Sequence, residues 1–177
     1  MKWVTRERPK IDRIACPWLI ERFIDKTPEF LFVPSQDVLS SAEKTGAIPY
    51  DIPGVEMSHV GEYCSFDAFL NKYPLTDPGL AMLAVIVRGA DTSRLDLAPE
   101  AAGLFAISLG LSQNFKNDHE MLKHGMVMYG RPVRLVQILP EGAAWLAVQG
   151  SKSLTSAGAT RRERMRYCFA MNVTASL

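Results

Sequence analysis

The chain carries four segments in which apolar side chains recur at steps of three and four residues, the spacing of one face of a helix. These segments span residues 65–73, 77–88, 99–110 and 112–129. The second begins with Asp77-Pro78, a typical helix start, and is followed by Gly89. The third is apolar nearly all round, which predicts a central position. Helices are therefore expected to dominate the fold.

Before residue 65 the predicted elements are shorter and of mixed type. The expected elements are strands at residues 2–5 and 29–34 and helices at residues 11–23 and 35–44. Pro17 should start or kink the first helix, and Gly46 should close the second. With 177 residues, 47% of them hydrophobic and 22% charged, the chain is predicted to form a single, predominantly helical α+β domain with a few short strands.

Composition argues against several classes of protein. No run of about 18 apolar residues is present, so a membrane span is not expected. The first ten residues carry charges where a signal peptide needs an apolar stretch, and three scattered cysteines are too few for a disulfide framework. Residues 1–129 hold 13 Lys and Arg against 17 Asp and Glu, which gives no support for nucleic-acid binding. We expect a cytoplasmic protein and leave a homo-oligomer open.

All three histidines lie in two short stretches. His59 stands alone, whereas Asp118-His119-Glu120 and His124 fall within one predicted helix. Imidazole and carboxylate are the ligands that first-row metal ions take, and they also transfer protons. At 100° per residue, His119 and Asp118 lie at the edges of the apolar stripe, while Glu120 and His124 share the opposite face.

Helix geometry therefore divides the cluster. We predict a Zn, Mn or Fe ion held by Glu120, His124 and the distant His59, with His119 as a further ligand or neighbour. The alternative is that His119 belongs to the core and that Glu120 and His124 form a solvated ion pair. The spacing is not the His-Glu-x-x-His pattern, because the two helical histidines are five residues apart.

Several other side chains are weaker candidates. Cys16 near a helix start would be a reactive thiol, or else buried filler beside a proline. Arg13 and Arg88 are candidate oxyanion-binding residues, and the basic run around Arg13 is alternatively a solvated face. The remaining candidates are the ligand-rich stretch of His59, Glu62, Cys64 and Asp67, and the charges Asp91, Arg94 and Asp96, expected mainly as loop charges and caps.

Long strings of the sequence also resemble a known family. They include TRERPKIDRIACPWLIERFID, GAIPYDIPGVEMSHVGEYCSFDAFL, IVRGADTSRLDLAPEAAGLFAISLGLS and DHEMLKHGMVMY, and they span residues 3–129. These strings resemble the chromate-resistance domain of the ChrB C-terminal type. The resemblance implies a role in chromate resistance, in some relatives as a sensor or regulator and in others beside a rhodanese-type domain. It carries over no catalytic residues.

The resemblance ends after residue 129. Relatives continue the last helix with a sequence similar to Asp-Ala-Leu-Tyr-Ala-Trp-Cys, and the same codons read one base out of phase give the Gly-Arg-Pro-Val-Arg-Leu-Val found at 130–136. Residues 130–177 hold 7 Lys and Arg against 2 Asp and Glu, opposite to the rest of the chain. We therefore predict that 1–129 is the family domain and that 130–177 is an atypical basic tail, frameshift-derived and poorly ordered.

Together these observations predict a metal- or oxyanion-binding protein of chromate resistance. A sensor or accessory module with a His/Glu metal site is the first hypothesis, with a small oxyanion such as chromate as its ligand. The alternative is a metalloenzyme that carries out redox or hydrolytic chemistry at the same site.

Overall fold

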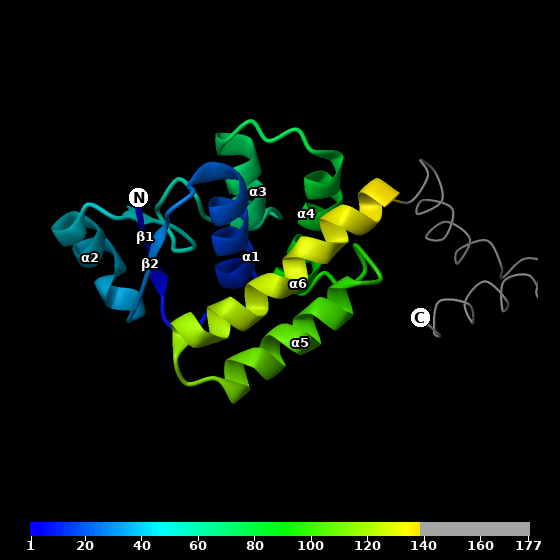
Figure 1. Cartoon of the computed structure of the whole chain (residues 1–177). Coiled ribbons are helices and arrows are strands. Elements are labelled where there is room, and N and C mark those ends of the chain that lie inside the picture. Colours follow the sequence, from blue (N-terminus) through cyan, green and yellow to red (C-terminus); the bar gives the residue numbers. More distant parts are fainter. Residues whose placement is uncertain (139–177) are drawn as a thin grey trace, which may run out of the picture. The chain divides into compact units, whose positions relative to one another are not determined.

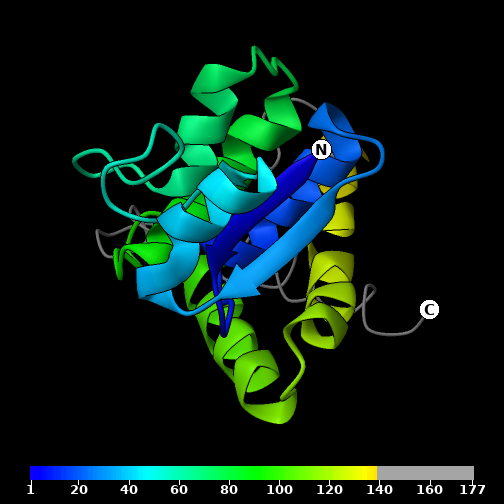
Figure 2. The ribbon, with the colours of Figure 1, turned by 90° about the vertical axis from the view of Figure 1, so that its left-hand side faces the viewer.

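The computed structural model describes residues 1–138, in which a small parallel sheet lies against a set of helices (Figure 1). Strand β1 (Lys2–Arg6) is central and pairs in parallel with β2 (Glu29–Val33) and with the short β3 (Ile48–Pro49). Figure 2 shows β1 and β2 running side by side in the same direction. This order places the first strand of the chain at the centre of the sheet.

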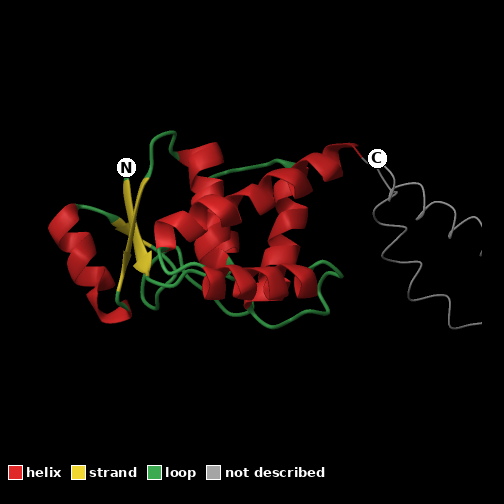
Figure 3. Ribbon diagram, turned by 60° about the horizontal axis from the view of Figure 1, so that its bottom comes forward, coloured by secondary structure: helices red, strands yellow, loops and turns green. Residues whose placement is uncertain are grey.

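The two faces of β1 contribute to two separate cores, because successive side chains of a strand point to opposite sides. Val4 packs with Val38 and Ala42 of helix α2 (Val38–Thr45), which follows a 3₁₀ turn (Ser35–Asp37). Trp3 faces the larger core on the other side of the sheet. The sheet thus lies between α2 and the remaining helices (Figure 3).

Helix α1 (Asp12–Leu19) occupies the centre of the larger core. Each of its residues except Arg13 is buried, and α3, α4 and α6 pack around it. Pro17 lies inside this helix, which continues as a π-helical turn (Ile20–Ile24). The other helices are α3 (Ser65–Lys72), α4 (Pro78–Asp91), α5 (Ala101–Asn114) and α6 (Asp118–Ile138). This arrangement confirms the predicted α+β, mainly helical class.

Two expectations about the helices are wrong. Helix α5 is peripheral and not central, because α1 fills the core and only Ala101, Ser108 and Ser112 of α5 are buried. The predicted helix at 112–129 begins at Asp118, since Asn117 caps it: the Asn117 side chain accepts a hydrogen bond from the Glu120 backbone N–H at 3.0 Å. Gly46 does close α2, with a left-handed φ of 68°.

The predicted boundary between the family domain and the tail, after residue 129, lies within helix α6, which continues to Ile138. The rest of the predicted tail, residues 139–177, lies outside the described residues. Within residues 1–138, every helix is too short or too polar to cross a membrane.

Arg8 ties the loop before α1 to the turn between α5 and α6. Its guanidinium donates to the carbonyls of Phe115 (2.8 Å), Lys116 (3.2 Å) and Ser112, and its backbone N–H donates to Asp118 at 2.9 Å. The Ser112 carbonyl lies in the last turn of α5, where carbonyls have no partner within the helix, and the other two carbonyls follow directly after the helix. Arg8 thus caps the C-terminal end of α5.

Replacing Arg8 with methionine should lower the free energy of unfolding by about 1–2 kcal/mol, because the carbonyls at the end of α5 lose a charged donor. Urea denaturation measures this change. Lys10→Met, which removes a neighbouring exposed charge, is the matched control and should stay within about 0.5 kcal/mol of the wild type. Equal effects of the two substitutions would contradict the capping role.

Candidate metal centre

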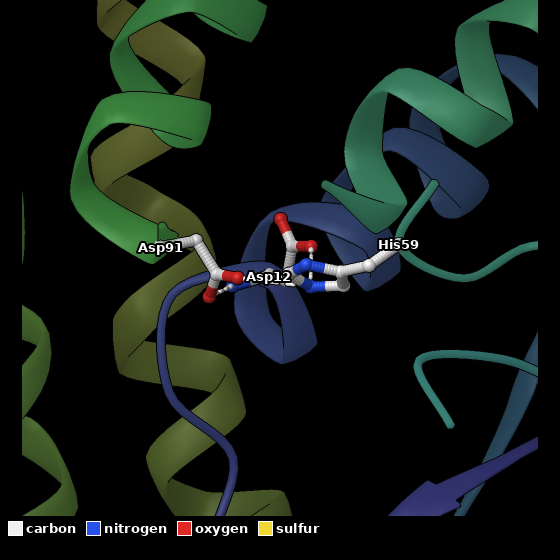
Figure 4. Close-up of side chains that lie close together, drawn as sticks. All are labelled: Asp12, His59 and Asp91. Carbon is white, nitrogen blue, oxygen red and sulfur yellow. Dashed lines mark hydrogen bonds and ion pairs between the residues drawn. The ribbon is translucent and has the colours of Figure 1, made fainter. Parts of the chain in front are cut away.

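Three ligand-bearing side chains from distant parts of the chain meet at one point (Figure 4). Asp12 is the first residue of α1, Asp91 is the last residue of α4, and His59 lies in the loop between β3 and α3. His59 Nε2 lies 3.1 Å from Asp91 Oδ2 and 3.5 Å from Asp12 Oδ2. One ligand atom from each residue lies within 4.8 Å of the other two, so a single ion could contact all three.

Two helix N-termini hold the carboxylates in place. Asp12 Oδ2 accepts the backbone N–H of Ser65, the first residue of α3, at 2.6 Å. Asp91 Oδ1 accepts the backbone N–H of Asp12, the first residue of α1, at 3.4 Å. The free N–H groups and positive dipole end of a helix stabilise negative charge. Each carboxylate is therefore oriented by a helix other than the one that carries it.

A third carboxylate, Asp51, lies beside the other two. Its Oδ1 accepts from Ser65 Oγ at 2.9 Å and lies 3.4 Å from His59 Nε2. Its Oδ2 pairs with Arg6 Nη2 at 2.8 Å and with Arg13 Nε at 3.0 Å. The Asp51 backbone has a left-handed φ of 53°, which aspartate tolerates better than most residues. The two arginines thus offset part of the negative charge that collects around His59.

The ionisable groups perturb one another strongly. Hydrogen bonds to Asp12 and Asp51 raise the pKa of His59 to about 10. Burial raises the pKa of Asp91 to about 7, and it also raises the pKa of Asp12. Burial opposes ionisation of Asp51, but its hydrogen bonds to His59 and Arg6 outweigh burial and lower its pKa. A protonated His59 therefore supplies positive charge at the point where a metal dication would also fit.

One carboxylate oxygen of the cluster, Asp12 Oδ1, is buried without a hydrogen-bond partner among the described residues. Asp12 is 1% exposed, and among the described residues its Oδ1 has no hydrogen-bond partner. Buried polar atoms are rarely left in this state, since the desolvation cost is then not repaid. A coordinated ion or its bound water would provide the missing interaction.

The donor set fits a divalent first-row ion. Two carboxylates and one imidazole suit Mn, Fe or Zn. For bonds of about 2.1 Å, adjacent ligand atoms around an octahedral ion lie about 3 Å apart. The separations of 3.1 and 3.5 Å from His59 Nε2 are close to this value. Three protein ligands would leave further coordination positions open, and His59, whose side chain is 40% exposed, faces solvent at that point.

The histidines of α6 have different neighbours from His59. His119 lies edge-on to Phe32 with ring centres 5.2 Å apart, and His124 stacks on Phe115 at 4.7 Å. Glu120 is exposed. The structure thus brings His59 together with Asp12 and Asp91 and does not bring it to the Glu120/His124 pair. Metal binding by His119, Glu120 and His124 stays a prediction.

The two arginines predicted to bind an oxyanion are paired with carboxylates, and the cysteine predicted to be reactive is buried. Arg13 pairs with Asp51, and Arg88 forms a two-point pair with Asp67 at 2.9 and 2.6 Å while its guanidinium covers the Tyr63 ring at 4.6 Å. Cys16 is fully buried, and this burial raises the pKa of its thiol well above the ordinary value. A buried, protonated thiol is not the activated nucleophile that the sequence suggested.

Sequence reasoning missed two of the three residues of this cluster. Asp12 is not among the candidates that the sequence suggested, and Asp91 was expected mainly as a loop charge or cap. Both residues nevertheless occupy unusual positions relative to their helices. A helix C-terminus disfavours an acid, so Asp91 at the end of α4 stands where helix electrostatics alone would not place it. Asp12 interrupts a run of inward-facing apolar positions.

Comparison with known proteins assigns the chain to a family. A sequence profile described as "ChrB, C-terminal domain" matches residues 3–134. The curated Protein ChrB of Cupriavidus metallidurans is 34% identical over 122 residues, which are 68% of this chain but only 36% of that protein. No solved structure matches the chain. The chain therefore belongs to the family of ChrB C-terminal domains, the chromate-resistance family that its motifs resemble.

Proposed function

We propose that this domain is a metal-binding sensor or accessory module in chromate resistance, with a divalent first-row ion held by Asp12, His59 and Asp91. The observation that carries the proposal is the meeting of these three donors around the unpartnered Oδ1 of buried Asp12. Membership of the ChrB family supports the link to chromate resistance.

An ion at this point would act as a cross-link within the fold. It would join the start of α1, the end of α4 and the loop that carries His59. The occupied and ion-free states would then differ in how firmly that loop is held, which is the kind of difference that a partner can sense. A small oxyanion such as chromate would reach the open coordination positions from the solvent side of His59.

A metalloenzyme is the second candidate, and the coordination positions left open beside the 40% exposed side chain of His59 favour it. An ion with open positions would add the Lewis-acid chemistry that hydrolytic or redox reactions need.

Metal titration of matched variants tests the site. Mn²⁺, Fe²⁺ and Zn²⁺ are added to metal-free protein, and binding is followed by calorimetry and by the rise in Tm. We expect Asp12→Asn, His59→Gln and Asp91→Asn to weaken binding by about a hundredfold, since each removes one ligand of three. Glu120→Gln and His124→Gln are the controls and should bind like the wild type.

The two sets of variants separate the competing assignments. Loss of binding in Glu120→Gln and His124→Gln but not in Asp12→Asn would move the ion to α6. A metal-free wild type that takes up none of the three ions would remove the metal-binding function altogether. Circular dichroism of each variant confirms that it has folded before its affinity is compared.

A further inference from the structure

Helix α5 presents an uncharged face to solvent. None of its 14 residues is Asp, Glu, Lys or Arg. The exposed positions are Ala102, Gly103, Ala106, Ile107 and Gly110, followed in the last turn by the uncharged polar residues Gln113 and Asn114. Ile107, at the middle of the helix, is 55% exposed. Surface helices ordinarily place charged residues on the solvent side, so this face is suited to contact with another protein surface.

The described part of the chain leaves this face open. Among the elements of residues 1–138, α5 packs mainly against α4 and α6, and it turns Ser108 and Ser112 inward. Figure 1 shows α5 at the edge of these helices, with α6 between it and α1. Leu104, Phe105 and Leu111 pack against the larger core, but burial within residues 1–138 does not explain the apolar residues on the exposed side of α5.

The shape of the face allows a second helix to approach closely. Gly103 and Gly110, two turns apart, have no heavy atom within 4 Å of the place where a β-carbon would stand. Small residues on one face let two helix backbones come near each other, and larger apolar side chains between them then interlock. Ile107 lies between the two glycines and supplies such a side chain.

The charges at the two ends of α5 identify the partner. Exposed Glu100 precedes the helix, and exposed Lys116 follows it. A second copy of α5 laid antiparallel on the first brings Glu100 of each copy to Lys116 of the other, across a helix about 21 Å long. In a two-fold interface the central part of α5 contacts the same part of the second copy, and because it carries no charge there is no like-charge repulsion.

We propose that two copies of this chain form a dimer through antiparallel packing of α5, with the two-fold axis near Ile107. The helix dipoles of the two copies also oppose each other in this arrangement, which is favourable. The interface contains none of the residues of the candidate metal centre, so each proposal can be tested without affecting the other.

Sedimentation analysis and light scattering of the full-length chain test the dimer at concentrations up to about 100 µM. We expect the wild type to have twice the mass of the 19.7 kDa chain. Ile107→Arg places two like charges near the axis and should raise the dimer Kd by at least about tenfold. Leu39→Arg, at a 53% exposed position of α2, is the matched control and should leave the Kd unchanged.

Charge reversal tests the antiparallel orientation without altering the apolar centre. Glu100→Lys and Lys116→Glu should each weaken the dimer at low salt, and the two changes combined should restore it. A wild type that stays monomeric overturns the proposal, even if hydrogen exchange shows α5 protected, because another segment then covers the helix. A dimer that Ile107→Arg leaves intact overturns it as well.

Discussion

Replacing Arg88 with leucine is expected to lower the free energy of unfolding by about 3 kcal/mol, and Tm by about 10 °C. Arg88 donates two hydrogen bonds to Asp67, a carboxylate that is 7% exposed. The same carboxylate accepts the backbone N–H of Cys64 at 3.0 Å at the start of α3. Without the guanidinium, Asp67 would be a buried charge with too few partners. Urea and thermal denaturation measure the loss.

Two further variants show whether the buried pair causes the effect. Arg94→Leu removes an arginine from an exposed pair with Asp96 and should leave the free energy of unfolding close to that of the wild type. Adding Asp67→Asn to Arg88→Leu removes the orphaned charge and should recover part of the loss. An Arg88 variant as stable as the Arg94 variant would show that the pair with Asp67 contributes little.

The affinity of the site for a divalent ion is expected to rise about tenfold per pH unit between pH 7 and 8, and more steeply near pH 6. Hydrogen bonds to Asp12 and Asp51 raise the pKa of His59 to about 10, so its proton must leave before Nε2 can bind an ion. Below pH 7, Asp91, whose pKa burial raises to about 7, gives up a second proton. Calorimetry in buffers of different ionisation enthalpy counts the protons released.

The ion-free protein should show the opposite trend with pH. The raised pKa of His59 contributes stability that is fully present below its unfolded value of 6.5 and is lost as the pH rises through about 10. The raised pKa of Asp91 also makes the folded state less stable as the pH rises from 3.8 to about 7. Tm in the presence of a chelator should therefore fall from pH 6 to 9. A Tm that rises over this range, or that falls equally in His59→Gln, would contradict this account.

The sequence predicted the class of the fold well, because that class depends on local patterns. The strand at β1, the left-handed cap at Gly46 and the start of α4 after Asp77 all follow from residue type and spacing. The place of α5 was predicted wrongly for a physical reason. An apolar helix is buried by whatever covers it, and composition alone does not say whether that is the same chain or another.

The candidate site was harder to predict, because long-range packing assembles it. Asp12, His59 and Asp91 are separated by 30 residues or more, and their meeting depends on α1 and α3 aiming their N-termini at carboxylates from elsewhere. His59 was a candidate because histidine is rare in this chain. Glu120 and His124 were chosen as its partners because they share one face of a predicted helix, which says nothing about their distance from His59 in the fold.

The central position of α1 has a consequence for how the protein is made. Helix α6 covers α1 so closely that a β-carbon on Gly125 would lie 2.7 Å from Ile14 Cγ2, and the buried Tyr129 hydroxyl donates to the Ile11 carbonyl at 3.3 Å. Strand β1 and α1 precede the rest of this domain in the sequence, yet their burial waits until about residue 129 has left the ribosome. Contacts of such long sequence separation slow folding. The nascent domain therefore exposes its most buried helix until α6 has been made, which is when chaperone binding would protect it.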